Sequence, residues 1–190
     1  MNMSEKRDVQ EDGTLDLRGV IHIKLREYYD NQFIRKVIIG SSVQTIGKLA
    51  FSRCENLREI NFEEPCQITK LEHSCFSYCS NLTKIDLPSS IQEIDNYVFN
   101  ACPLERVILR SPCRIGDDCF RTNTFTYLHI ADSIQELNKK VFYQNFNLPF
   151  SKAPCKIYIR PEFHDKIKRM FSVHEVEFIG NELEEGYVLK

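Results

Sequence analysis

An aromatic residue followed three positions later by Cys or Asn occurs six times along the chain at nearly even spacing. The pairs are Tyr28/Asn31, Phe51/Cys54, Phe76/Cys79, Phe99/Cys102, Phe120/Asn123 and Phe142/Asn145. Successive aromatics lie 23, 25, 23, 21 and 22 residues apart. A period in the low twenties is typical of a solenoid, in which each turn buries its apolar edge against its neighbours.

The apolar residues between these pairs follow the same period. After each Cys or Asn come an apolar residue, two further residues and then apolar-x-apolar, as in Ile34/Val37/Ile39, Leu57/Ile60/Phe62, Leu82/Ile85/Leu87, Leu104/Val107/Leu109 and Phe125/Leu128/Ile130. The spacing alternates inward and outward positions, which predicts one short strand per turn. A second apolar pair follows at Val43/Ile46, Ile68/Leu71, Ile91/Ile94 and Ile134/Leu137, with Ile23 and Ile115 in the second place.

These positions together resemble the BspA-like subclass of leucine-rich repeats. Segments 50–57 (AFSRCENL) and 75–82 (CFSYCSNL) match the repeat most closely, and segment 88–94 (PSSIQEI) adds the usual turn. The resemblance extends from about Leu15 to Ile159 and weakens at Asn123 and again near Pro149. It implies an α/β-type repeat solenoid, a leucine-rich repeat arc with short parallel strands, about six repeats and a C-terminal strand-helix-strand cap.

The repeat pattern divides the chain into three parts. Residues 1–12 are expected to form a polar N-terminal tail, 13–160 the solenoid and 161–190 the cap. The last solenoid strand is expected near Ile157. In the cap, residues 162–171 have apolar positions at helical spacing after Pro161, and Val176 to Ile179 predict a strand before an acidic tail. Such a cap hides the core edge of a terminal turn, which has no neighbour.

Composition excludes several classes of function. The formal net charge of −2 over 190 residues argues against a nucleic-acid platform, which needs a basic patch. No apolar run approaches the length of a membrane span, and the first residues contain no secretory h-region. We therefore expect a cytoplasmic protein, with the cell surface, reached by non-classical export, as the alternative.

The eight cysteines are expected to be reduced structural thiols. Cys54, Cys79 and Cys102 share a repeat position with Asn, where a small polar side chain satisfies backbone groups inside the turn. Cys75 and Cys119 share a position with small aliphatic residues and are expected to be buried. A disulfide between stacked Cys54 and Cys79, or between Cys79 and Cys102, is the alternative that the spacing leaves open.

Metal binding and catalysis find little support in the pattern. The segment from His73 through Cys75 to Cys79 has a loose zinc-like spacing, but the repeat already accounts for both cysteines. The five histidines occupy unrelated repeat offsets, so no Cys–His pair emerges, and no phosphate-binding glycine loop occurs. We expect no enzyme, no metal and no cofactor.

The outward residues of successive strands form the expected partner-binding face. They are Arg35, Ile38, Arg58, Asn61, Lys84, Asp86, Arg106, Ile108, Tyr127 and His129. Ile38, Ile108 and Tyr127 are the expected apolar anchors, and Arg58 and Arg106 the expected charged ones. The alternative is that all are ordinary surface side chains. The family resemblance implies a non-catalytic protein–protein interaction module; the other hypotheses are a surface adhesin binding host or matrix proteins and an enzyme of unrecognised type.

Overall fold

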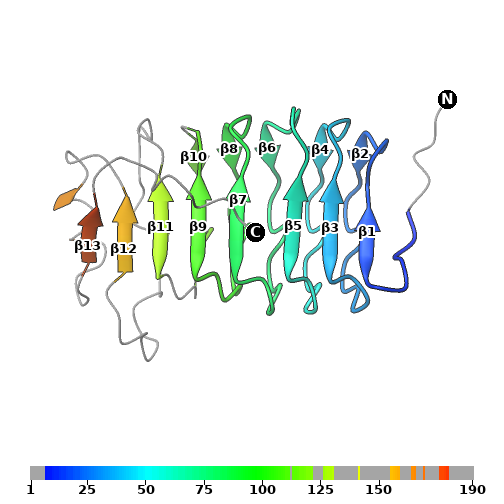
Figure 1. Ribbon diagram of the computed structural model, residues 1–190, viewed down its shortest axis with the longest axis horizontal. Coiled ribbons are helices and arrows are strands. Elements are labelled where there is room, and N and C mark those ends of the chain that lie inside the picture. Colours follow the sequence, from blue (N-terminus) through cyan, green and yellow to red (C-terminus); the bar gives the residue numbers. More distant parts are fainter. Residues whose placement is uncertain are drawn as a thin grey trace.

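The described strands lie in two parallel rows along a solenoid, and the second row ends at β10 while the first continues to β13 (Figure 1). This computed structural model describes residues 7–111, 113–121, 126–130, 141, 155–158, 164–165, 169 and 176–179. The first row consists of β1 (Thr14–Asp16), β3 (Lys36–Ile39), β5 (Glu59–Phe62), β7 (Lys84–Leu87), β9 (Arg106–Leu109), β11 (Tyr127–Ile130), β12 (Cys155–Tyr158) and β13 (Val176–Ile179). The second row consists of β2 (His22–Ile23), β4 (Thr45–Ile46), β6 (Lys70–Leu71), β8 (Glu93–Ile94) and β10 (Arg114–Ile115).

Every strand pairing is parallel and in the register of the sequence repeat. Val37 pairs with Ile60, for example, and Val107 pairs with Ile85 and Leu128, so each coil places the same apolar position against its neighbours. The first row divides into the sheets β1-β3-β5 and β13-β12-β11-β9-β7. The parallel-strand solenoid is therefore confirmed, and strands β12 and β13 lie where the sequence predicted strands, near Ile157 and over Val176–Ile179.

The five repeated aromatic residues that the structure describes form one continuous stack inside the solenoid. Ring centroids of Tyr28 and Phe51 lie 5.3 Å apart, those of Phe51 and Phe76 5.3 Å, and those of Phe76 and Phe99 5.8 Å. Phe99 and Phe120 continue the stack at 5.6 Å. Because each ring occupies the same place in its coil, the sequence period becomes a column of nearly parallel rings in the core.

The turns that carry these rings are not helices, and this corrects the expected α/β class. Each of the first four turns contains two non-glycine residues with positive φ, four positions apart: Arg26/Asp30, Leu49/Arg53, Ser74/Tyr78 and Tyr97/Ala101. A left-handed residue interrupts an α-helix, and the described part of the chain contains almost no helix. The cap helix expected over 162–171 lies mostly outside the described residues; 164, 165 and 169 are described and are helical.

Residues 7–12, expected as part of a polar tail, lie against the first coil. The Arg7 backbone N–H donates to the Tyr28 hydroxyl at 3.1 Å, and Val9 packs on the core. The chain then turns at Gly13, whose φ of +86° suits glycine, and enters β1.

Candidate binding surface

All ten residues expected on the partner-binding face lie on, or directly before, strands of the first row. Two series are in register across neighbouring strands. Lys84, Arg106 and Tyr127 form one, and Asp86, Ile108 and His129 form the other. On the other sheet Ile38 pairs with Asn61, while Arg35 and Arg58 directly precede β3 and β5. The fold therefore brings these side chains onto one row of strands, as the period predicted.

Side chains on β7, β9 and β11 are already engaged with one another. The Arg106 guanidinium lies over the Tyr127 ring, 4.0 Å from its centroid, in cation–π contact. Arg110, just beyond β9, donates from Nε to Asp86 Oδ1 at 2.7 Å and from Nη2 to Oδ2 at 2.6 Å. This bidentate pair and the Arg106–Tyr127 contact link neighbouring coils and hold these side chains in place.

Ile108 is buried, so its expected role as an exposed apolar anchor is wrong. Its side chain is 1% exposed although its register is outward. It lies between Asp86 and His129 on the neighbouring strands. Ile38, in the equivalent position on β3, is partly exposed and is the aliphatic group that the surface presents.

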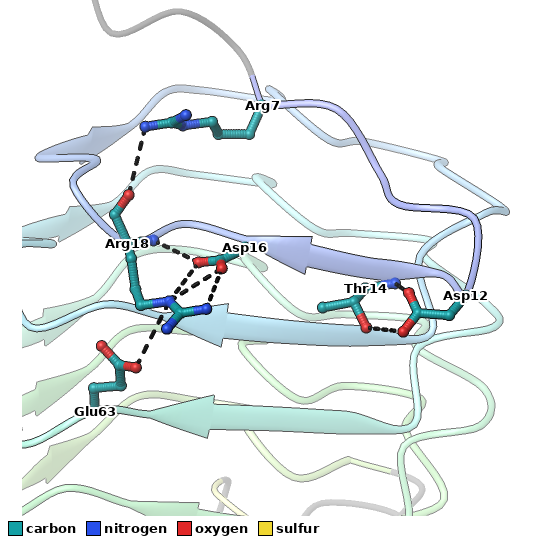
Figure 2. Close-up of polar contacts among 6 residues, drawn as sticks. All are labelled: Arg7, Asp12, Thr14, Asp16, Arg18 and Glu63. Carbon is teal, nitrogen blue, oxygen red and sulfur yellow. Dashed lines mark hydrogen bonds and ion pairs between the residues drawn. The ribbon is translucent and has the colours of Figure 1, made fainter.

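The β1–β5 end of the face carries a second polar network, drawn in Figure 2. Arg18 Nε donates to Asp16 Oδ1 at 2.9 Å and lies 3.9 Å from the Glu63 carboxylate. Hydrogen bonds from Arg18 lower the pKa of Asp16 to about 2. On the next strands Lys36 forms an ion pair with Glu59 at 2.9 Å, which lowers the pKa of Glu59.

Two arginines of these networks, Arg18 and Arg110, were not anticipated. Both directly follow the second inward residue of their strand, Leu17 and Leu109. The other coils have Gly40, Glu63 and Pro88 at this position, so the repeat gave no common residue type. Asp86 and Arg110 lie 24 residues apart, close to one period, and this spacing could have revealed the pair.

Arg35 and Arg58 remain available for a partner. Both side chains are exposed, and neither forms an ion pair with a described residue. The aliphatic part of Arg35 lies over Gly13, where a Cβ would stand 2.8 Å from Arg35 Cγ. The surface thus combines two free guanidinium groups with Ile38 and the Arg106–Tyr127 pair.

The cysteines lie inside the coils, where the repeat placed them. Sγ of Cys54, Cys79 and Cys102 each donates to a carbonyl of the preceding coil, at 3.1, 3.4 and 3.1 Å, which confirms the ladder position. Cys75 and Cys119 are fully buried, as expected. Burial raises the pKa of Cys54 to about 12 and the pKa values of Cys75, Cys79 and Cys119 well above the usual range.

The zinc-like segment does not form a described metal site. Cys75 and Cys79 are buried in the core, whereas the His73 ring lies edge-on to Tyr97 at 5.5 Å. Among the residues that the structure describes, no three His, Cys, Asp or Glu side chains are grouped to hold a metal ion. Within that same part of the chain, no helix has the length and apolar character needed to cross a bilayer.

The comparisons with known proteins agree with this geometry. The BspA type leucine-rich repeat region matches residues 21–149 in six copies, which is more than half of the chain. The chain belongs to the BspA-type leucine-rich repeat family. Among curated proteins, no match was found.

Three solved structures of leucine-rich repeat or antigen proteins have similar folds. The T. pallidum leucine-rich repeat protein TpLRR is 22% identical with a TM-score of 0.67, over 92% of this chain and 89% of that one. A Bacteroides ovatus leucine-rich repeat protein is 23% identical with a TM-score of 0.60, over 84% of this chain and 46% of that one. The pneumococcal vaccine antigen PcpA is 17% identical with a TM-score of 0.64, over 90% and 42%. The chain therefore spans less than half the length of the last two.

Proposed function

We propose that this BspA-type repeat domain is a non-catalytic module that binds another protein through the exposed face of its first row of strands. The observation that supports this best is the pair of exposed guanidinium groups of Arg35 and Arg58, which lack a carboxylate partner among the described residues. They border Ile38 on a surface whose other charges are largely paired. Arginine is one of the residues that contribute most to binding energy in protein interfaces.

The paired side chains suit this role because they are fixed before a partner arrives. The Arg106–Tyr127 contact and the Asp86–Arg110 pair each join neighbouring strands, so their ordering costs little further entropy on binding. The free cations call for acidic groups on the partner, placed to meet Arg35 and Arg58. The buried thiols, with raised pKa values, support a role other than cysteine-based catalysis.

A cytoplasmic location is proposed together with this function. The seven cysteines whose side chains the structure describes are free thiols, and such cysteine usage suits a reducing compartment. The alternative is an adhesin-like surface protein that binds host or matrix proteins; the similarity to a pneumococcal antigen concerns the fold alone. Counting thiols after denaturation without reductant distinguishes the two: all eight should react, and a deficit of two or more would favour an oxidising compartment.

The binding face is tested by charge reversal. A tagged Arg35→Glu/Arg58→Glu protein should lose the proteins that the wild-type chain captures from its native cells. A Lys48→Glu/Lys24→Glu protein, changed by the same net charge at exposed residues away from the first row, should retain them. Unfolding curves of both variants must match the wild type. Retention by the strand-face variant, or loss only in the control variant, would reject the assignment of this face.

A further inference from the structure

The hydrogen-bonded ladder of the first row of strands is interrupted between β5 and β7. Along the described chain, the row divides at this point into the sheets β1-β3-β5 and β13-β12-β11-β9-β7. The space between β5 and β7 is also wider than the spaces between the other neighbours of the row (Figure 1). The third coil (residues 59–83) and the fourth coil (84–105), counted from the first coil at 14–35, meet at this β5–β7 junction.

Backbone hydrogen bonds at the start of each strand show the same interruption. One carbonyl before a strand accepts from two successive N–H groups of the following coil: Gly13 from Arg35 and Lys36, Arg35 from Arg58 and Glu59, Thr83 from Glu105 and Arg106, and Glu105 from Thr126 and Tyr127. The Arg58 carbonyl holds this position before β5, and Thr83 and Lys84 carry the corresponding N–H groups. No such bond joins these three residues, all of which the structure describes.

The length of the third coil accounts for part of this interruption. Five residues separate its inward Phe62 from Ile68, whereas three separate Ile39 from Val43 in the second coil (residues 36–58). The two extra residues lie directly beyond β5, at the edge where the ladder stops. The chain therefore follows a longer path after β5 than after β3, and the third coil does not match the period of its neighbour.

Pro88 removes a further bond from the junction. Directly after β5, the Glu63 N–H donates to the Ile39 carbonyl of the second coil at 2.9 Å. Pro88 holds the equivalent place directly after β7, and proline has no N–H. It cannot make the corresponding bond to the Phe62 carbonyl.

Inward side chains beside the junction are less well covered than those elsewhere in the first row. Ile60 is 8% exposed, whereas Val37 and Val107, at the same repeat position, are 0% exposed. Phe62 is partly exposed, although Ile39 at its position in the second coil is fully buried. The opening between β5 and β7 therefore reaches the edge of the core.

The third and fourth coils remain joined along their other two sides. In the second row the Glu93 N–H donates to the Thr69 carbonyl at 3.1 Å, and Lys70 Nζ forms an ion pair with Glu93 at 3.1 Å. In the turns the Phe76 N–H donates to the Val98 carbonyl at 3.2 Å. The two coils are thus bonded through the second row and the turns, and open along the first row.

We propose that the β5–β7 junction is a hinge, at which the sheet β1-β3-β5 moves relative to the sheet that begins at β7. The bonded second row and turns form the axis, so the motion widens and narrows the opening on the first row. Glu59 and Lys84 begin the two strands, and their opposite charges attract across the opening. Collective motions of this kind take place on the μs–ms timescale.

The hinge divides the strand face that carries the proposed binding residues. Arg35, Ile38 and Arg58 lie on one side of it, and Arg106 and Tyr127 lie on the other. The motion changes the spacing of these two groups while the contacts within each sheet persist. It belongs to the free protein, so it does not depend on the existence of a partner.

Relaxation-dispersion NMR of the free protein tests the hinge. Backbone amides of residues 58–62 and 83–87 should show μs–ms exchange, because their surroundings change as the opening widens and narrows. Amides of residues 106–109 in β9 and of 93–95 in the second row should show none, because their ladders are continuous. Absence of exchange beside the junction, or equal exchange along the whole first row, would overturn the proposal.

Disulfide trapping tests the direction of the motion. The variant Glu59→Cys/Lys84→Cys is made with Cys66→Ser, which removes a partly exposed native thiol. A disulfide requires Cα atoms about 4.4–6.8 Å apart, so in oxidised glutathione the bond should form as the opening narrows. It should form more slowly than in Lys36→Cys/Glu59→Cys, made with the same Cys66→Ser change, whose two positions are paired in the ladder.

The trapped protein should lose the μs–ms exchange beside the junction, and reduction of the bond should restore it. Three results would contradict the hinge: equal rates for the two cysteine pairs, a bond in the control pair alone, or exchange that persists after trapping.

Discussion

At the scale of single residues, the ring column is the feature on which stability depends most directly. Phe76 is fully buried and stacks between Phe51 and Phe99. Phe76→Ala should lower the free energy of unfolding by about 3–5 kcal/mol, because the lost ring leaves a cavity between coils. Urea denaturation measures the change. Tyr78→Ala, which removes a half-exposed ring two residues away, should cost less than about 1 kcal/mol. Similar values for both variants would contradict the stacked placement.

Buried thiols should make the folded state sensitive to alkaline pH. In the unfolded chain a thiol ionises near pH ~8.5, whereas burial raises the pKa of Cys54 in the fold to about 12. Above the unfolded pKa the unfolded state therefore binds fewer protons, and stability falls as pH rises. Each such thiol contributes a slope of up to about 1.4 kcal/mol per pH unit.

The contribution of one thiol is isolated by substitution. Between pH ~8.5 and ~10, the free energy of unfolding of Cys54→Ala should fall less steeply than that of the wild type, whatever their difference at neutral pH. Denaturation curves at several pH values give both slopes. Lys48→Ala, an exposed change, should keep the wild-type slope. If the free energy of unfolding of Cys54→Ala falls with pH as steeply as that of the wild type, the Cys54 thiol ionises as readily in the folded state as in the unfolded state.

The sequence predicted the inward residues better than the surface. Because Cys and Asn alternate at one repeat position, the sequence predicted a side chain there that hydrogen-bonds to the backbone. Cys54, Cys79 and Cys102 do so, each with a carbonyl of the preceding coil. Ile108 shows the limit of the method. Alternation gives the direction of a side chain, but exposure also depends on which residues occupy the neighbouring strands, and that follows from three-dimensional stacking.

At the scale of elements, the first row of strands was predictable and the second row was not. The L-x-x-L-x-L spacing marks strands of three or four residues. The second row has only two residues per strand, such as Thr45–Ile46, too few to show an alternating pattern. The left-handed residues of the turns were also hidden, since Arg26, Leu49, Ser74 and Tyr97 share one place without sharing a residue type. Chain stacking, and not local preference, imposes this conformation.

Close approach of neighbouring coils explains one glycine in these elements. A Cβ on Gly47 would lie 2.8 Å from the Ile23 carbonyl oxygen and 2.9 Å from the Leu25 nitrogen, both backbone atoms of the first coil. Gly47→Ala should therefore lower the free energy of unfolding by about 1–3 kcal/mol by forcing the coils apart. The neighbouring exposed change Lys48→Ala is the control and should cost less than about 0.5 kcal/mol. A neutral Gly47→Ala in chemical denaturation would show that the gap between coils adjusts freely.

At the scale of the whole molecule, the period alone predicted a solenoid, because regular spacing requires each unit to meet its neighbours in the same way. It could not predict that the hydrogen bonds between the described turns run in one sense, with the N–H groups of Tyr28, Phe51 and Phe76 each donating to a carbonyl of the following coil. That asymmetry arises from backbone geometry in the turns, where residue types vary from coil to coil. The exposed apolar side chains of Ile21, Leu25, Tyr29 and Phe33 were visible in the sequence only as apolar residues outside the repeat positions.

Removal of a complete coil tests whether each coil is stabilised mainly by contacts with its nearest neighbours. Deleting residues 84–105 removes β7, β8 and Phe99 and joins Thr83 to Arg106. Val107 then follows Leu82 by three positions, as Ile85 does in the wild type, so the repeat register is preserved. Phe120 can then stack on Phe76, and each remaining coil still has neighbours. The shortened chain should fold cooperatively with a lower free energy of unfolding and a smaller denaturant m-value, because less surface is buried.

Deletion of half a coil provides the contrast. Removing residues 84–94 takes away both strands but leaves the turn around Phe99, which then has no strand to hold it in register. This chain should lose the β signal in far-UV circular dichroism and the cooperative transition in urea. The two deletions thus separate register from length: the larger one preserves the repeat and the smaller one breaks it. If both unfold alike, interactions beyond nearest-neighbour coils stabilise the molecule, and the stability of the solenoid is not a sum over its coils.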